Sequence, residues 1–172
     1  MSTLNSKFSI GFNALMKRIE ETLTEIKHID QNMGQLEGNS SRPDVAFPCT
    51  LIDFTNWTFT NMTQNSQVGE GLVEVSLGFA QFTPSANIVE AVYRDQALEF
   101  YEIEHRLNAA LHGWSPGDDF GTLTRIGTNT ANKMKGIRIR TLIYKLEFED
   151  HSTKVVTRSI PKPPLETTSE LI

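Results

Sequence analysis

The side chains in this chain with the most obvious capacity for chemistry are its four histidines and one pair of adjacent aspartates. His105 and His112 share a predicted helix, but their spacing separates them by about 10 Å along the axis, too far to bind one zinc ion. Asp118 and Asp119 stand in a Pro-Gly turn, where aspartates usually form the turn and seldom act as general acid and base. These residues therefore predict neither a metal site nor a catalytic carboxylate pair.

The eleven glycines do not assemble into a phosphate-binding loop. Gly69-Glu70-Gly71 lacks the third glycine and the following helix of a dinucleotide-binding loop, and neither a Gly-Lys-Ser/Thr motif nor a Gly-x-Ser-x-Gly elbow occurs. Cys49 is the only cysteine, which excludes an internal disulfide and a cysteine-based zinc cage, and its expected role is that of a small buried apolar residue. We therefore expect no cofactor and no enzymatic activity.

A basic cluster and two aromatic residues are the remaining candidates for binding. Four of the sixteen basic residues fall within eight positions of an acidic chain: Lys133, Lys135, Arg138 and Arg140. A solvated loop and strand end explains such a cluster, but it also suits contact with carboxylates of a neighbouring subunit or with nucleic acid. Trp57 and Phe59, at alternate strand positions, suit base stacking or, more commonly, core or interface packing. We take all six as candidate residues of a subunit or lumen interface.

The bulk composition is that of one globular domain. The chain has 172 residues, 38% of them hydrophobic and 22% charged, with a net charge of −5. This acidic balance argues against a general nucleic-acid binder, and the sequence shows neither a secretory signal nor an apolar run long enough for a membrane span. We expect a single domain over residues 1–156 and an extended or disordered, Pro-rich arm over residues 157–172.

Apolar spacing predicts two helices. One begins near Phe8 and ends by Gly34, and the other runs from Tyr93 to Leu111 before Gly113 and Pro116. Between the first helix and the first strand, residues 34–48 are predicted to form a polar loop with little reason to pack.

Alternating or β-branched segments predict four strands, at residues 49–60, 68–79, 122–128 and 137–148, with loops at 61–67 and 129–136. The order helix, two strands, helix, two strands indicates an α+β fold. In it, two helices pack on one face of a mostly antiparallel sheet of four or more strands.

The last of these strands has an apolar face that changes sides. Ile137 and Ile139 lie on one face at its start, whereas Leu142, Tyr144 and Leu146 lie on the other face towards its end. One flat strand with a single buried face cannot satisfy both halves. Either a bulge near Leu142 flips the register, or the two ends pack against different partners, such as the domain and a neighbouring subunit.

The chain resembles the tail terminator, or tail completion, proteins of long-tailed bacteriophages in the order and length of its elements between about residues 8 and 153. The segments that carry the resemblance are Pro48-Cys-Thr-Leu-Ile-Asp-Phe54, the helix Gln96–Gly113, Leu123-Thr-Arg-Ile126, and Ile143–Asp150 after a polar loop. The Pro-rich arm after Thr157 has no counterpart in the pattern of the family.

The resemblance implies a virion protein, assembled in the host cytoplasm, that forms a ring, usually a hexamer. The ring would end polymerisation of the tail tube and join the tail to the head or neck connector. Its partners would be itself, the tube protein and the connector, with transient proximity to phage DNA in the lumen and no membrane contact. Alternatives are another head-to-tail connector component, such as a neck adaptor, or a nucleic-acid-contacting module. Replacing Arg138 and Arg140 with glutamate is expected to weaken assembly without unfolding the monomer.

Overall fold

The computed structural model describes residues 5–37, 45–80, 85–134 and 136–153. Within these ranges the elements are, in chain order, α1 (Lys7–Thr22), β1 (His28–Gln31), β2 (Cys49–Thr63), β3 (Ser66–Ala80), α2 (Ala91–Leu111), β4 (Thr124–Met134) and β5 (Ile137–Asp150). The α+β class predicted from the sequence is confirmed. Residues 157–172, predicted as an arm, lie outside the described ranges.

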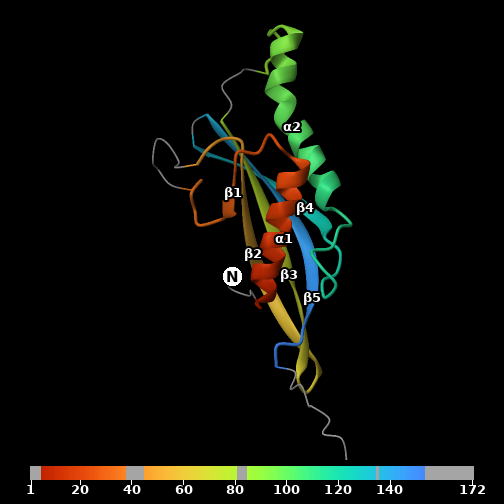
Figure 1. Ribbon diagram of the computed structural model, residues 1–172. Helices are drawn as coiled ribbons and strands as arrows, with labels where there is room; N and C mark the ends of the chain where they lie inside the picture. Colours follow the sequence, from red (N-terminus) through yellow and green to blue (C-terminus); the bar gives the residue numbers. More distant parts are fainter. Residues whose placement is uncertain (1–4, 38–44, 81–84, 135, 154–172) are drawn as a thin grey trace, which may run out of the picture.

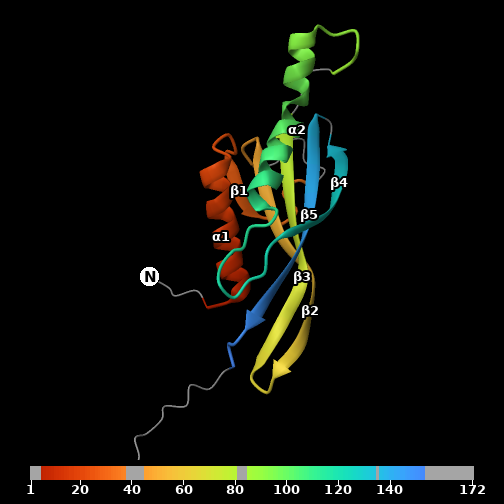
Figure 2. The ribbon, with the colours of Figure 1, turned by 90° about the vertical axis from the view of Figure 1, so that its right-hand side faces the viewer.

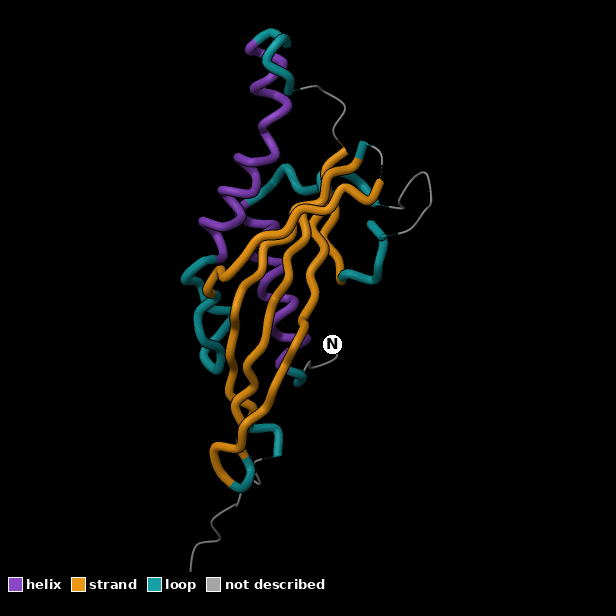
Figure 3. The backbone as a smooth tube through the Cα atoms, turned by 180° about the vertical axis from the view of Figure 1, so that it is seen from behind, coloured by secondary structure: helices purple, strands orange, loops and turns teal. Residues whose placement is uncertain are grey.

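The strands form one open sheet in the order β1-β2-β3-β5-β4. All neighbours are antiparallel except β1 and β2, which are parallel. The β2–β3 and β4–β5 pairs are hairpins, and β5 returns beside β3 along its whole length, from Ala80 opposite Ile137 to Gln67 opposite Asp150. Figure 3 shows the strands side by side in front of the two helices.

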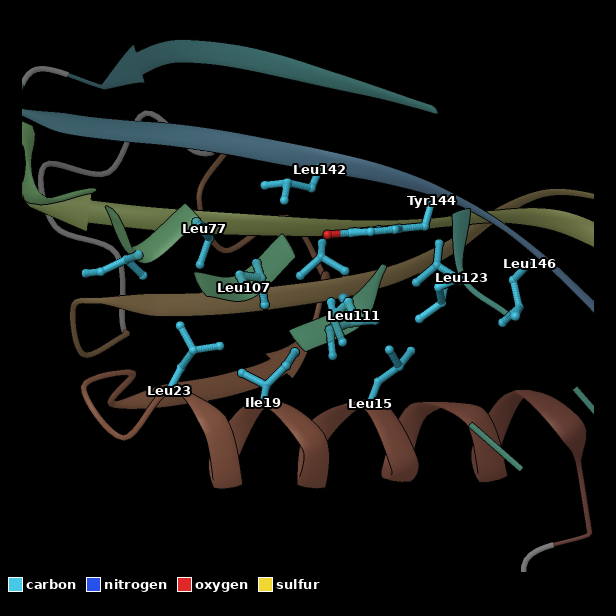
Figure 4. Close-up of a cluster of buried hydrophobic side chains, with 14 of the residues drawn as sticks. Leu15, Ile19, Leu23, Leu77, Leu107, Leu111, Leu123, Leu142, Tyr144 and Leu146 are labelled. Carbon is cyan, nitrogen blue, oxygen red and sulfur yellow. The ribbon is translucent and has the colours of Figure 1, made fainter. Parts of the chain in front are cut away.

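The main core joins both helices to the sheet. Leu15, Ile19 and Leu23 of α1 pack in the same cluster as Leu107 and Leu111 of α2. Figure 4 shows these side chains meeting residues of the strands and of the segment before β4: Leu77, Leu123, Leu142, Tyr144 and Leu146. Most of these side chains are fully buried, so the hydrophobic effect fixes the helices against the sheet.

A second, smaller cluster explains the two-faced strand. Ile139 packs with Leu36, Cys49 and Leu51, and Ile137 lies against their edge, whereas Leu142, Tyr144 and Leu146 belong to the main core. The register between β3 and β5 runs without a shift, so no bulge is needed against β3. The two ends of β5 therefore pack against different partners, and both partners belong to this chain.

The segment between α1 and β2 differs from the prediction. The helix was expected to end by Gly34, and it ends at Thr22, with β1 following before Gly34. The segment predicted to be an unpacked loop carries Leu36, only 3% exposed, and Val45 and Phe47, which pack against the second cluster. Periodicity missed this because β1 has only four residues, because Leu36 stands between the polar residues Gln35 and Glu37, and because Val45 and Phe47 form too short an apolar run before Pro48.

The last hairpin also differs from the prediction. The loop expected over residues 129–136 is largely strand, because β4 continues to Met134 opposite Ile137. Residues such as Thr128, Thr130 and Asn129 are polar because β4 is an edge strand with little to bury, so their composition resembled that of a loop. Two register shifts interrupt the pairing of β4 with β5, one between Arg125 and Gly127 and one between Ala131 and Met134.

Two elements project beyond the main core at opposite ends of the molecule. Figures 1 and 2 show the first turns of α2 extending past one end of the sheet and the β2–β3 hairpin past the other. The hairpin turn is tight, since Thr63 pairs with Ser66 and only Gln64 and Asn65 intervene. No helix in the described part of the chain combines the length and the apolar character that crossing a membrane requires.

Candidate functional site

The structure places the six candidate interface residues in separate regions. Trp57 and Phe59 lie near the β2–β3 hairpin, where Phe59 pairs with Gly69 and Gly69 with Phe148. Arg138 pairs with Phe79 at the other end of β5, ten residues away from Phe148, or about 33 Å along the strand. Lys135 and the side chain of Lys133 lie outside the described residues. The structure therefore does not bring the aromatic and basic candidates together.

Trp57 is an internal packing residue of the hairpin end. Its ring stacks on Phe148 with centroids 4.9 Å apart and meets Phe8 of α1 edge to face at 5.1 Å. It also lies over Gly71, where a Cβ atom would come within 2.4 Å of the indole. The missing side chain of Gly71 thus makes the space for Trp57, and the aromatic group stiffens a hairpin that extends past the main core.

Arg140 is part of a buried ion cluster. Its Nε and Nη2 atoms donate to Glu104 at 2.7 and 2.9 Å, and Nη2 of Arg125 donates to the same carboxylate at 2.9 Å. Glu104 is 5% exposed, in the middle of α2. The Glu104 cluster, formed by Glu104, Arg125 and Arg140, therefore ties α2 to β4 and β5 through charge-assisted hydrogen bonds.

The charges of the two arginines also set the protonation state of Glu104. Burial would raise the pKa of the Glu104 carboxyl, but the hydrogen bonds and charges of Arg140 and Arg125 outweigh it, so that pKa lies below its ordinary value. The same carboxylate raises the pKa of Arg140. Glu104 is therefore ionised in the folded protein at neutral pH and is a structural anchor.

Acid is expected to weaken this anchor. A carboxyl whose pKa is lower in the folded than in the unfolded state stabilises the fold above the unfolded pKa, about 4.3, and this contribution is lost as the pH falls through the folded value. The difference in unfolding free energy between the wild type and Glu104→Gln should therefore shrink from neutral pH towards pH 3. Urea denaturation at a series of pH values measures it, and a difference that stays constant would contradict the assignment.

Arg138 lies against aromatic rings of α2. Its guanidinium is 4.3 Å from the ring centroid of Phe100 and 5.3 Å from that of Tyr101, and its Nη2 donates to the Tyr101 hydroxyl at 2.9 Å. This cation–π arrangement adds a second, more exposed connection between α2 and β5. Both arginines predicted as interface residues thus have partners within the chain.

The projecting end of α2 carries an exposed apolar surface. Tyr93, Ala97 and Phe100 follow one stripe of the helix, but Ala97 and Phe100 are buried against the body whereas Tyr93 is 50% exposed. Val92 and Ile88, in and before the first turn, are 60% and 89% exposed. The apolar stripe that covers the sheet therefore continues past it. We call Ile88, Val92 and Tyr93 the helix-tip surface.

The hairpin end carries a second apolar surface. Phe59 is 46% and Met62 52% exposed on β2. Phe59 contacts Phe148, so its position is fixed by the same aromatic cluster that holds Trp57. We call Phe59 and Met62 the hairpin surface. Exposed apolar side chains gathered on projecting elements are typical of protein contact sites.

Asp119 and His112, two of the residues with a capacity for chemistry, make contacts that support the fold. Asp119 pairs with Lys7 at the start of α1, which lowers the pKa of that carboxyl, the opposite of what a general acid needs. Nδ1 of His112 accepts the backbone N–H of Arg125 at 3.1 Å, and His105 is exposed on α2. Within the described ranges, no group of three or more His, Cys, Asp or Glu side chains is placed to bind a metal ion.

Cys49 is expected to resist alkylation in the folded protein. The thiol is fully buried, and burial raises its pKa to about 11, so little thiolate forms near pH 8. Iodoacetamide followed by mass spectrometry should modify the native chain far more slowly than the same chain in urea. Equal rates in the two conditions would show that the second cluster opens readily.

Comparison with known proteins finds matches among solved structures only. Neither a family model nor a curated protein matches the chain. Among solved structures, a chain of the structure titled "Virion of native gene transfer agent (GTA) particle" has a TM-score of 0.46 and 9% sequence identity, covering 81% of this chain and 94% of that chain. A likeness of this degree carries no conclusion about function.

Sequence patterns alone missed two features of the site. Glu104 stands in the same helical stripe as Phe100, Leu107 and Leu111, and a carboxylate in an apolar stripe is the signal that could have revealed a buried ion cluster. The helix-tip surface had no such signal, since Tyr93 fits the apolar stripe whether or not a sheet lies opposite it. Tyr93 is exposed because the sheet ends before it reaches this part of α2.

Proposed function

We propose that this protein is a structural virion subunit that closes into a ring at the head-proximal end of a phage tail tube. The ring stops tube polymerisation and joins the tail to the head or neck connector. The resemblance of the element order to tail terminator proteins motivates the proposal. Both helices pack in the main core on one face of the sheet, and the second cluster covers part of the other face. The rest of that face and the two projecting ends remain for contacts.

The observation that carries the proposal is the placement of apolar surfaces at opposite ends of the subunit. The helix-tip surface and the hairpin surface leave Val92, Tyr93, Phe59 and Met62 between 46% and 60% exposed. Surfaces that differ and lie apart favour heterologous contacts, which generate rings when the rotation closes.

The face of the sheet opposite the helices is acidic, as expected of a surface that lies near DNA but does not bind it. Strand alternation places Asp53, Glu70, Glu74 and Glu147 there, with Lys145 paired to Glu70 at 2.9 Å. An acidic surface repels the phosphate backbone, so tight DNA binding is not expected. This charge supports a capping ring over a nucleic-acid-contacting module.

The test is polymerisation of the tail tube protein in the presence of increasing amounts of this protein, with tube length measured by negative-stain electron microscopy. The wild type should shorten the tubes and label one end. A Val92→Asp, Tyr93→Asp variant should leave tube length unchanged while melting near the wild-type temperature, because both side chains are exposed in the subunit.

Other outcomes separate the rival functions. Tubes of unchanged length, together with binding to a head or neck connector, would indicate a neck adaptor. Unchanged tubes together with DNA affinity that falls steeply with salt would indicate a nucleic-acid-contacting module. Either result would overturn the tail-capping proposal.

A further inference from the structure

We infer that a groove at the base of the projecting part of α2 binds the segment 154–165 of a neighbouring copy of this chain. The inference rests on the self-association that the proposed function requires. It deepens that function by naming one contact that would link adjacent subunits.

The groove lies where α2 leaves the sheet and has a volume of about 200 Å³. Its lining residues are Glu25, Pro48, Phe79, Ala80, Gln96, Glu99, Phe100 and Ile103. Phe79, Phe100 and Ile103 are core residues no more than 6% exposed, so they form a fixed apolar floor. Aromatic floors of this kind suit proline-rich segments, which bind as preformed extended helices.

The rim of the groove is acidic. Glu25 is already paired with Arg106 at 2.6 Å, whereas Glu99 forms no ion pair among the described residues. The first half of α2 with the residue before it, residues 90–102, holds Glu90, Asp95, Glu99 and Glu102 against Arg94, a formal charge of −3. A ligand for this surface should therefore be apolar, extended and basic.

The segment 154–165 has that chemistry. Its charged residues are Lys154, Arg158 and Lys162, a formal charge of +3 in a chain whose net charge is −5. Its apolar residues are Val155, Val156, Ile160 and Leu165, and Pro161, Pro163 and Pro164 favour the polyproline II conformation. The charges of this segment and of residues 90–102 are therefore equal in size and opposite in sign.

Chain length shows why the middle of the segment, including Arg158 and Ile160, must come from another copy. The groove lies beside Phe79 and Ala80, which pair with the start of β5, whereas the segment follows the end of β5, about 43 Å away along the strand. Ile160 is seven residues beyond Thr153, the last described residue, and reaches at most about 25 Å from it. Neither Arg158 nor Ile160 can therefore reach the groove of its own subunit.

Disulfide trapping between two full-length populations tests the inference. One population carries Gln96→Cys at the groove rim and a tag that changes its mass, and the other carries Ile160→Cys. Cys49 is buried and does not interfere. Mild oxidation of the mixture at high protein concentration should give a covalent heterodimer in several-fold greater yield than a control mixture with Asn129→Cys, an exposed residue of β4. Adding Glu99→Lys to the first population should lower the yield.

Two results would overturn the inference. One is a heterodimer yield no greater than that of the Asn129→Cys control. The other is a disulfide within single chains when Gln96→Cys and Ile160→Cys are combined and the protein is diluted. The tube-length assay separates this inference from the proposed function, because tubes that are still shortened when no trapped heterodimer forms would mean that only the arm contact is wrong.

Discussion

Replacing Arg140 with glutamate is expected to lower the free energy of unfolding by about 3–5 kcal/mol, the range for breaking a buried ion pair. The substitution removes both hydrogen bonds from Arg140 to Glu104 and places a second carboxylate beside one that is 5% exposed. Arg125 alone then compensates two negative charges. Urea denaturation followed by tryptophan fluorescence measures the loss.

Arg138→Glu is the matched control, because Arg138 lies two residues away on the same face of β5 and carries the same charge. Its stacking on Phe100 and Tyr101 is more exposed, so its loss should cost about 1 kcal/mol. Equal losses for the two variants would contradict the special role of the Glu104 cluster. The double substitution at Arg138 and Arg140 is consequently no clean test of assembly, because it is expected to destabilise the subunit itself.

Gly71→Ala is expected to lower the free energy of unfolding by about 1–3 kcal/mol, the cost of overpacking a filled site. The added Cβ atom would lie 2.4 Å from the Trp57 indole, so the ring must leave its stack on Phe148. Displacement exposes the indole to water, and the tryptophan emission should shift to longer wavelength. Equilibrium denaturation and the emission spectrum of the folded variant provide two independent readouts.

Gly127→Ala provides the control for this substitution. Gly127 is also a strand glycine, but an added Cβ atom would meet only Ile143 at 3.9 Å, an ordinary contact. This variant should be as stable as the wild type or slightly more so, because alanine reduces the entropy of the unfolded chain. A Gly71→Ala protein with unchanged stability and emission would show that Trp57 does not depend on the space above Gly71.

The elements predicted correctly are those in which local pattern and tertiary environment agree. The second helix was expected from Tyr93 to Leu111 and spans Ala91–Leu111, and the strands at Cys49 and Ile137 begin at the predicted residues. Long segments with one buried face have a period that matches their geometry. β1 and the second half of β4 were missed because short or edge strands bury too little to impose a period.

The packing of β5 could be predicted only in part from local sequence patterns. Residues 137–148 required two different partners, and the sequence correctly excluded a single buried face. It could not identify the second partner, because Leu36 and Phe47 lie about a hundred residues earlier in a segment without periodicity. A neighbouring subunit was one hypothesis for the second partner of this strand, but the structure shows that the second partner is a segment of the same chain.

The sequence by itself determined the α+β class, the main helix and strand positions, and the two-sided burial of the last strand. It did so because side-chain spacing must match the period of the element that buries it. Only the tertiary structure decided that Arg140 binds Glu104 and that Trp57 occupies the space above Gly71. It also decided that the apolar stripe of α2 extends beyond the end of the sheet. These features depend on where separate elements end relative to one another, which no local pattern encodes.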